Sequence, residues 1–135
     1  MIALDTNVLA RLLLQDDAAQ FIRAKALLAT DQPFTAPVTV LLELVWVLES
    51  NDCMATDIQR ALNLLLNLPN FNPPQAAAVR LALDAFVQGM DFADALHLAL
   101  CKDEDALITF DKAFVNFIGP ITIAQPCPKC HFPGP

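Results

Sequence analysis

The sequence has few basic residues and few glycines. Its 135 residues include eight Lys and Arg, fifteen Asp and Glu, three glycines and ten prolines, and the net charge is −7. So few cations exclude a protein that holds nucleic acid through a broad basic surface. The composition, 56% hydrophobic, also excludes a disordered or collagen-like chain. The length fits one compact domain with a substantial core.

Long uninterrupted apolar runs are also missing. Prolines and asparagines interrupt the chain at 69–74, and Gly119-Pro120 interrupts it again, so no run reaches the roughly 20 residues of a membrane span. No basic leader precedes the first apolar segment, which argues against a secretory signal. We therefore expect a cytoplasmic protein whose four cysteines are free thiols rather than disulfides.

Short apolar segments alternate with longer amphipathic ones. The apolar segments predict strands at Ile2–Leu4, Phe34–Ala36, Ala106–Phe110 and Ile121–Ala124. Helical spacing predicts helices over 6–14, 18–29, 37–48, 56–68, 75–88, 91–101 and 112–117. This alternation is typical of a three-layer α/β/α domain, with a parallel central sheet of four to five short strands flanked by helices. We expect this domain to occupy residues 1–125 and a Pro/Cys-rich tail to occupy 126–135.

One helix start has a recognisable sequence pattern. Thr56 and Gln59 have the spacing of a capping box, in which each side chain bonds a backbone amide of the other residue. We expect this pair to begin the helix that ends before Pro69.

Acidic residues occur where a packed domain would not choose them for stability. Asp5 and Asp111 end predicted strands, Glu43 lies in an almost wholly apolar helix, and Asp94 lies in the first turn of another helix. Ligands of parallel sheets bind beyond the carboxyl ends of the strands. If these carboxylates converge there, a cation must offset their repulsion, and Mg²⁺ or Mn²⁺ prefers carboxylate and water oxygens.

A Mg²⁺ or Mn²⁺ site of this kind predicts phosphodiester hydrolysis. Carboxylate-held ions activate a water molecule and stabilise the leaving oxygen. The ions would also give a net acidic chain a phosphate-binding centre, so the negative charge does not exclude a nuclease.

Each acid also has a purely structural explanation. Asp5 and Asp111 are suited to cap the helices that follow them, and Asp91 is better placed than Asp94 to be an N-cap. Glu43 fits a solvated position of its helix. We favour a shared site over these separate explanations. If each acid had only a structural role, all four would have to lie along one edge of the sheet by coincidence.

The order and spacing of these residues resemble a known family. Asp5-Thr6-Asn7, Glu43, Asp91–His97 and Thr109-Phe110-Asp111 are similar to the motifs of the PIN domain, particularly of VapC-type toxins from toxin–antitoxin pairs. The resemblance covers Met1–Ala124. It implies a parallel sheet wrapped by helices, a Mg²⁺- or Mn²⁺-dependent ribonuclease and a homodimer. It also implies inhibition by a small DNA-binding antitoxin that lies across the active site.

The resemblance assigns roles residue by residue. The family's catalytic and metal-binding acids match Asp5, Glu43, Asp94 and Asp111, and its supporting polar positions match Thr6, Asn7, Asp91 and Thr109. The function implied is that of a metal-dependent endoribonuclease, the toxin of a type II toxin–antitoxin system. For the antitoxin, we expect apolar surface at Phe21, Leu41, Trp46 and Leu62, although Trp46 fits the core equally well.

Other functions fit the sequence less well. A haloacid-type phosphoryl-transfer domain needs a second Asp two positions after Asp5, where this chain has Asn7. A receiver-type domain needs paired acids after its first strand, which are also missing. A non-catalytic module that captures a basic peptide in an acidic cleft stays open as the alternative.

The tail departs from the family pattern. Cys127-Pro128-Lys129-Cys130-His131 has the CxxCH spacing of c-type haem attachment or of half a zinc site. The haem reading lacks a secretory signal, and the zinc reading lacks a second Cys/His pair nearby. We therefore expect an adventitious motif in a weakly ordered tail, with chelation by a second chain as the alternative.

Overall fold

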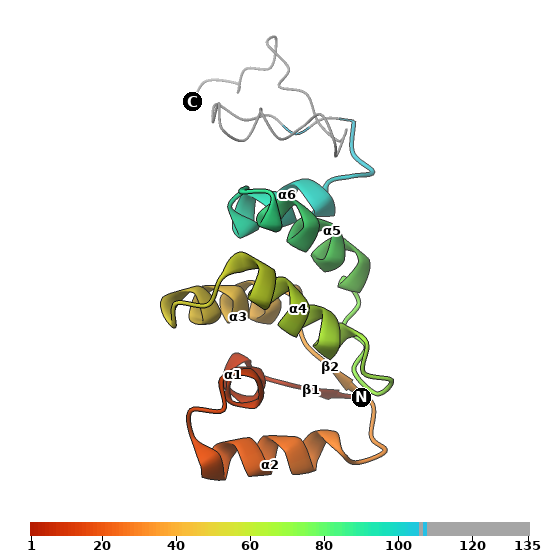
Figure 1. Cartoon of the computed structure of the whole chain (residues 1–135). Helices are drawn as coiled ribbons and strands as arrows, with labels where there is room; N and C mark the ends of the chain where they lie inside the picture. Colours follow the sequence, from red (N-terminus) through yellow and green to blue (C-terminus); the bar gives the residue numbers. More distant parts are fainter. Residues whose placement is uncertain (106, 108–135) are drawn as a thin grey trace, which may run out of the picture. The chain divides into compact units, whose positions relative to one another are not determined.

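The computed structural model describes residues 1–105 and 107 (Figure 1). The chain divides into two compact units, Met1–Arg80 and Leu81–Pro135. No helix of the described part is long and apolar enough to cross a membrane. Its elements are β1 (Ile2–Ala3), α1 (Thr6–Leu14), α2 (Ala18–Leu28), β2 (Phe34–Thr35), α3 (Val38–Ser50), α4 (Ala55–Leu66), α5 (Ala76–Val87) and α6 (Phe92–Leu100).

The first two predicted strands pair as expected. β1 and β2 are parallel, with Ile2 opposite Phe34 and Ala3 opposite Thr35. The Leu4 amide extends the ladder by donating to the Thr35 carbonyl at 2.8 Å. The described residues thus show a two-stranded parallel sheet rather than the expected four to five strands. The predicted strand over 106–110 lies outside these residues except for residue 107. The predicted strand over 121–124, the helix over 112–117 and the tail lie wholly outside them.

A third extended segment joins the sheet where the sequence indicated only a break. Phe71 forms a parallel bridge with Phe34. The Phe34 amide donates to the Asn70 carbonyl at 2.6 Å, and the Asn72 amide donates to the Phe34 carbonyl at 2.8 Å. Phe71 is only 2% exposed. Burial of this ring, together with the two backbone bonds, explains why a segment beside Pro69 follows the sheet.

The helices of the first unit pack around these strands. α1 contacts both α2 and α3, and α3 contacts α4. The predicted apolar stripe of α3 is confirmed, since its buried residues are Leu41, Leu44, Val45 and Leu48. α4 buries Ile58, Leu62, Leu65 and Leu66. α3 is therefore held in place on two sides, which fixes the positions of its exposed residues.

The capping box predicted for α4 is wrong. The helix begins at Ala55 with Met54 as its N-cap, and no side chain bonds the cap. Thr56 therefore lies inside the first turn, two positions past the N-cap Met54. The Asp57 carboxylate, also in the first turn, favours this helix end electrostatically.

In the second unit, α5 ends at a glycine as predicted. Gly89 has a φ of 110°, a conformation that a residue with a Cβ adopts only at a cost. The Gly89 amide donates to the Phe86 carbonyl at 3.0 Å, and the Met90 amide donates to the Ala85 carbonyl at 3.2 Å. These bonds form a Schellman motif that ends α5 and leads into α6. The Phe86 and Phe92 rings then pack edge to face, with centroids 5.7 Å apart.

Candidate active site

Asp5 lies at the junction between β1 and α1. Its backbone is extended, and it occupies the N-cap position of α1. Its Oδ1 accepts a hydrogen bond from the Thr6 amide at 2.7 Å. A capping aspartate normally accepts from the second or third helical amide instead. Within residues 1–105 and 107, Asp5 Oδ2 has no hydrogen bond or ion pair, so one oxygen is oriented and the other stays available.

The hydroxyl of Thr6, the residue that follows Asp5, is buried, whereas Asp5 itself is exposed. Thr6 is 3% exposed, and its Oγ1 has no hydrogen-bond partner in the described part of the chain. A buried hydroxyl left in this state costs about 1–3 kcal/mol. A small apolar side chain would avoid that cost. Asn7, the next residue of the motif, is exposed.

Glu43 lies in the middle of α3. Its neighbours Leu41 and Leu44 are buried, whereas Glu43 itself is exposed. α3 packs against α1, the helix that Asp5 begins (Figure 1). Glu43 makes no hydrogen bond or ion pair with any residue that the structure describes. The first unit therefore brings two acid-bearing elements into contact.

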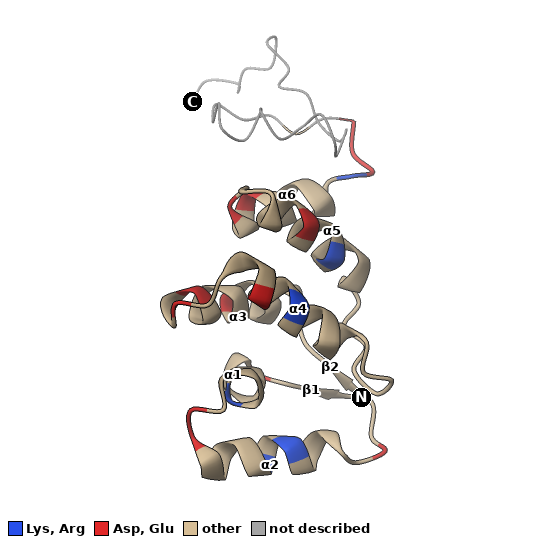
Figure 2. Cartoon of the chain, viewed as in Figure 1, with Lys and Arg blue, Asp and Glu red and all other residues tan. Residues whose placement is uncertain are grey.

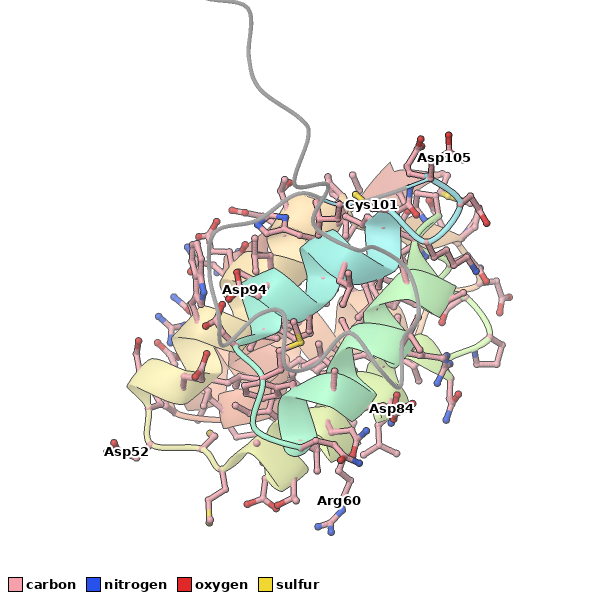
Figure 3. All side chains as sticks on the ribbon, turned by 90° about the horizontal axis from the view of Figure 1, so that it is seen from above. Asp52, Arg60, Asp84, Asp94, Cys101 and Asp105 are labelled. Carbon is pink, nitrogen blue, oxygen red and sulfur yellow. The ribbon has the colours of Figure 1, made fainter. Side chains whose placement is uncertain are left out.

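Asp91 and Asp94 lie at the start of α6, in the second unit. Asp91 is the N-cap, and its Oδ2 accepts from the Asp94 amide at 3.2 Å. This bond confirms the predicted capping role of Asp91. Asp94 is partly buried in the first turn of α6, where Figure 3 labels it.

The remaining predicted residues, Thr109 and Asp111, lie outside the described residues. Across residues 1–105 and 107, no three His, Cys, Asp or Glu side chains form a group that could hold a metal ion. Asp5 and Glu43 belong to the first unit and Asp94 to the second. The centre of four carboxylates stays a prediction.

The donor chemistry of the first unit suits a hard divalent cation. The ion pairs found in the described part join Arg11 to Asp16 and Arg60 to Asp57, so neither Asp5 nor Glu43 is neutralised by a basic side chain there. Figure 2 shows acidic positions on α3 as well as at the start of α1. Carboxylate and hydroxyl oxygens are the ligands that Mg²⁺ and Mn²⁺ favour.

A pocket between α1 and α2 was missed in the sequence. Its volume is about 460 Å³, and it is lined by Asn7, Val8, Arg11, Gln20, Arg23, Ala24 and Leu27. Asn7 therefore connects the Asp5 junction to this pocket. The pocket arises from the packing of two helices, and the apolar spacing of each helix alone carries no sign of it.

The expected apolar partner surface is wrong at two of its four positions. Leu41 and Leu62 are 1% and 0% exposed, because both pack into the core between α3 and α4. Trp46, by contrast, is 51% exposed. Phe21 is partly exposed on α2.

The sequence was compared with models of known protein families, and one family matches it. A family model for the PIN domain matches residues 2–118, a stretch that runs through both compact units and includes every predicted site residue. No curated protein and no solved structure matches the chain. PIN domains have an α/β fold and are generally nucleases that use divalent metal ions. The chain belongs to the PIN domain family.

Proposed function

We propose that this PIN domain is a metal-dependent endoribonuclease that acts in the cytoplasm as the toxin of a type II toxin–antitoxin system. The proposal rests mainly on the hydrogen bonding of Asp5 and Thr6 at the β1–α1 junction. There one oxygen of Asp5 is oriented by a backbone amide and the other has no bond to a described residue. The buried Thr6 hydroxyl likewise has no hydrogen-bond partner within residues 1–105 and 107.

Each site residue has a distinct role in this proposal. Asp5, Glu43, Asp94 and Asp111 hold Mg²⁺ or Mn²⁺, and Thr6, Asn7, Asp91 and Thr109 support them. When bound, the ion supplies positive charge to the phosphodiester and lowers the pKa of water. The Thr6 amide keeps the Asp5 carboxylate in one orientation. The Thr6 hydroxyl is suited to bond a carboxylate or a water molecule and so to orient it.

The charge balance of the chain supports the need for a divalent ion. With a net charge of −7, the protein repels RNA at long range. The acids at the site add to that repulsion, so substrate affinity depends on the ion and on the few basic side chains nearby.

The proposal includes a homodimer and a small antitoxin that inhibits the enzyme. The half-exposed Trp46 on α3 supports a protein partner on this face, because large aromatic side chains anchor protein interfaces. Trp46 follows Glu43 by three positions, so a partner bound there lies close to the acidic site.

Cleavage of single-stranded RNA by the purified chain tests the proposal. We expect cleavage with Mn²⁺ or Mg²⁺ and none after chelation. Asp5→Asn should lower the cleavage rate by at least about 100-fold, because the ion loses a charged ligand. Its thermal unfolding should stay unchanged or move upward, because repulsion between carboxylates is relieved.

A matched control removes the same charge elsewhere. Asp31 is exposed in the loop between α2 and β2, and Asp31→Asn should leave cleavage unchanged. Full activity in Asp5→Asn would contradict the mechanism. Affinity for a basic peptide without any RNA turnover would favour the non-catalytic binding module instead.

A further inference from the structure

The pocket between α1 and α2 has an apolar lining with four polar side chains, Asn7, Arg11, Gln20 and Arg23, which are mainly hydrogen-bond donors. Arg11 Nε donates to Gln20 Oε1 at 2.6 Å, and Arg11 Nη1 donates to both carboxylate oxygens of Asp16 at 3.0 and 2.9 Å. Arg11 Nη2 and the amide nitrogens of Gln20 and Asn7 have no acceptor among the described residues. No carboxylate is among the described residues that line the pocket. Its free groups are therefore suited to an anion.

Arg23 gives the pocket its uncompensated positive charge. It makes no hydrogen bond or ion pair within residues 1–105 and 107. Other arginines in that range are engaged: Arg60 pairs with Asp57 at 3.7 Å, and Arg80 donates to Asn63 and Asn67. In a chain with only eight basic residues, an arginine that lines a pocket and has no described partner is suited to bind an anion.

The rest of the lining fits a nucleotide unit. Val8, Ala24 and Leu27 give the pocket an apolar lining beside the donors. The volume of about 460 Å³ lies in the usual range of small-ligand pockets. A phosphate would bond the guanidinium groups, and a ribose or base would cover the apolar lining.

The position of the pocket connects it to the acidic junction. Asn7 lines the pocket and follows Asp5 by two positions on the first turn of α1. Basic positions on α1 and α2 are blue in Figure 2. A single RNA strand whose scissile phosphate lies at Asp5 would therefore pass a neighbouring phosphate into this pocket.

We propose that the α1–α2 pocket binds a phosphate and its nucleotide next to the scissile bond of a single-stranded RNA, with Arg23 as the main positioning residue. This inference rests on the proposed ribonuclease function. RNA is favoured over an acidic peptide because the pocket adjoins the Asp5 junction through Asn7.

Binding is measured first, without turnover. In the full-length Asp5→Asn chain with Mn²⁺, the affinity for a fluorescently labelled single-stranded RNA is followed by anisotropy at several salt concentrations. Arg23→Ala should raise the Kd about tenfold. It should also reduce the slope of log Kd against log salt concentration by about one, the contribution of one phosphate contact. Arg23→Lys keeps the charge and should recover part of the affinity. Arg23 is exposed, so thermal unfolding should not change.

Two control variants test whether any loss of RNA affinity comes from the pocket itself or from the loss of one positive charge anywhere on the protein. Arg60→Ala removes an arginine with 76% of its side chain exposed, and Lys25→Ala removes a cation that lies over the Phe21 ring on α2. Neither residue lines the pocket. Both variants should bind RNA within about twofold of the parent. Equal losses in all three variants, or no loss in Arg23→Ala, would overturn the inference.

Cleavage kinetics distinguish this inference from the proposed function. With Asp5 intact, Arg23→Ala should raise KM by about tenfold with little change in kcat, because Arg23 does not contact the reacting atoms. If the parent chain never cleaves RNA, the proposed function fails, whereas the anisotropy comparison still decides the pocket. If Arg23→Ala weakens only the binding of an acidic peptide, the RNA assignment is overturned.

Discussion

The side-chain amide of Asn70 donates a hydrogen bond to the backbone carbonyl of Leu28 at 2.9 Å. The same nitrogen lies 3.1 Å from the Thr30 carbonyl and 3.4 Å from the Gln32 carbonyl. These contacts tie the end of α2 and its following turn to the segment that bridges Phe34. One side chain thereby satisfies carbonyls that the helix end leaves without an internal donor.

Asn70→Ala should lower the free energy of unfolding by about 1–3 kcal/mol, because partly buried carbonyls lose their donor. Urea unfolding followed by circular dichroism measures this loss. The matched control is Asn72→Ala, which removes one exposed bond of 3.3 Å to the Pro69 carbonyl and should cost below about 1 kcal/mol. Equal losses in the two variants would contradict a special role for Asn70.

Thr6→Val should separate stability from activity. The Thr6 hydroxyl is buried and bonds none of the described residues. Replacing it with a methyl group should leave the free energy of unfolding unchanged or raise it by about 1 kcal/mol. RNA cleavage should fall about tenfold or more, since a group that orients the site is lost. Thr6→Ser keeps the hydroxyl and should retain most of the activity. Full activity in Thr6→Val would remove Thr6 from the site.

Asp91 is expected to act mainly through its helix cap. Asp91→Ala should lower the free energy of unfolding by about 0.5–2 kcal/mol, because the Asp94 amide loses its acceptor. Asp91→Ser retains a capping oxygen and should restore most of this stability. If Asp91→Ser unfolds like the parent chain but cleaves RNA much more slowly, the carboxylate has a second role at the site.

Asp16 restrains the positive charge of Arg11. Their ion pair spans 2.9 Å, with 34% and 47% of the two side chains exposed, so its loss should cost below about 1 kcal/mol. Asp16→Asn should also lower the Kd for single-stranded RNA severalfold, because the pocket gains net positive charge. Asp103→Asn removes the same charge from an exposed position of the second unit and is the control. Unchanged affinity in Asp16→Asn would argue against phosphate binding in the pocket.

Local patterns in the sequence predicted most helices and the first strand pair. Leu41, Leu44, Val45 and Leu48 share one face of α3 at helical spacing, and burial of that face follows from hydrophobicity alone. The left-handed glycine after α5 was also predictable, because few other residues tolerate that backbone conformation.

Tertiary contacts explain what the sequence did not predict. The extended segment at Phe71 depends on backbone hydrogen bonds to Phe34, which is distant in the sequence. The prolines and asparagines around Phe71 indicated only that the preceding helix ends there. The pocket around Arg23 depends on how α1 packs on α2. At the site, the pattern predicted that Asp5 follows a strand and that Glu43 lies on an apolar helix. It did not predict that the Thr6 hydroxyl is buried with no partner in the part of the chain that the structure describes.

Trp46 provides an intrinsic optical probe of the face that carries Glu43. It is the single tryptophan of a chain without tyrosine, and about half of its surface is open to solvent. Residues three positions apart on a helix are neighbours, so its indole lies near the Glu43 carboxylate. Manganese is paramagnetic, and its arrival at Glu43 would quench emission that magnesium leaves intact, which allows metal titrations on the unlabelled protein.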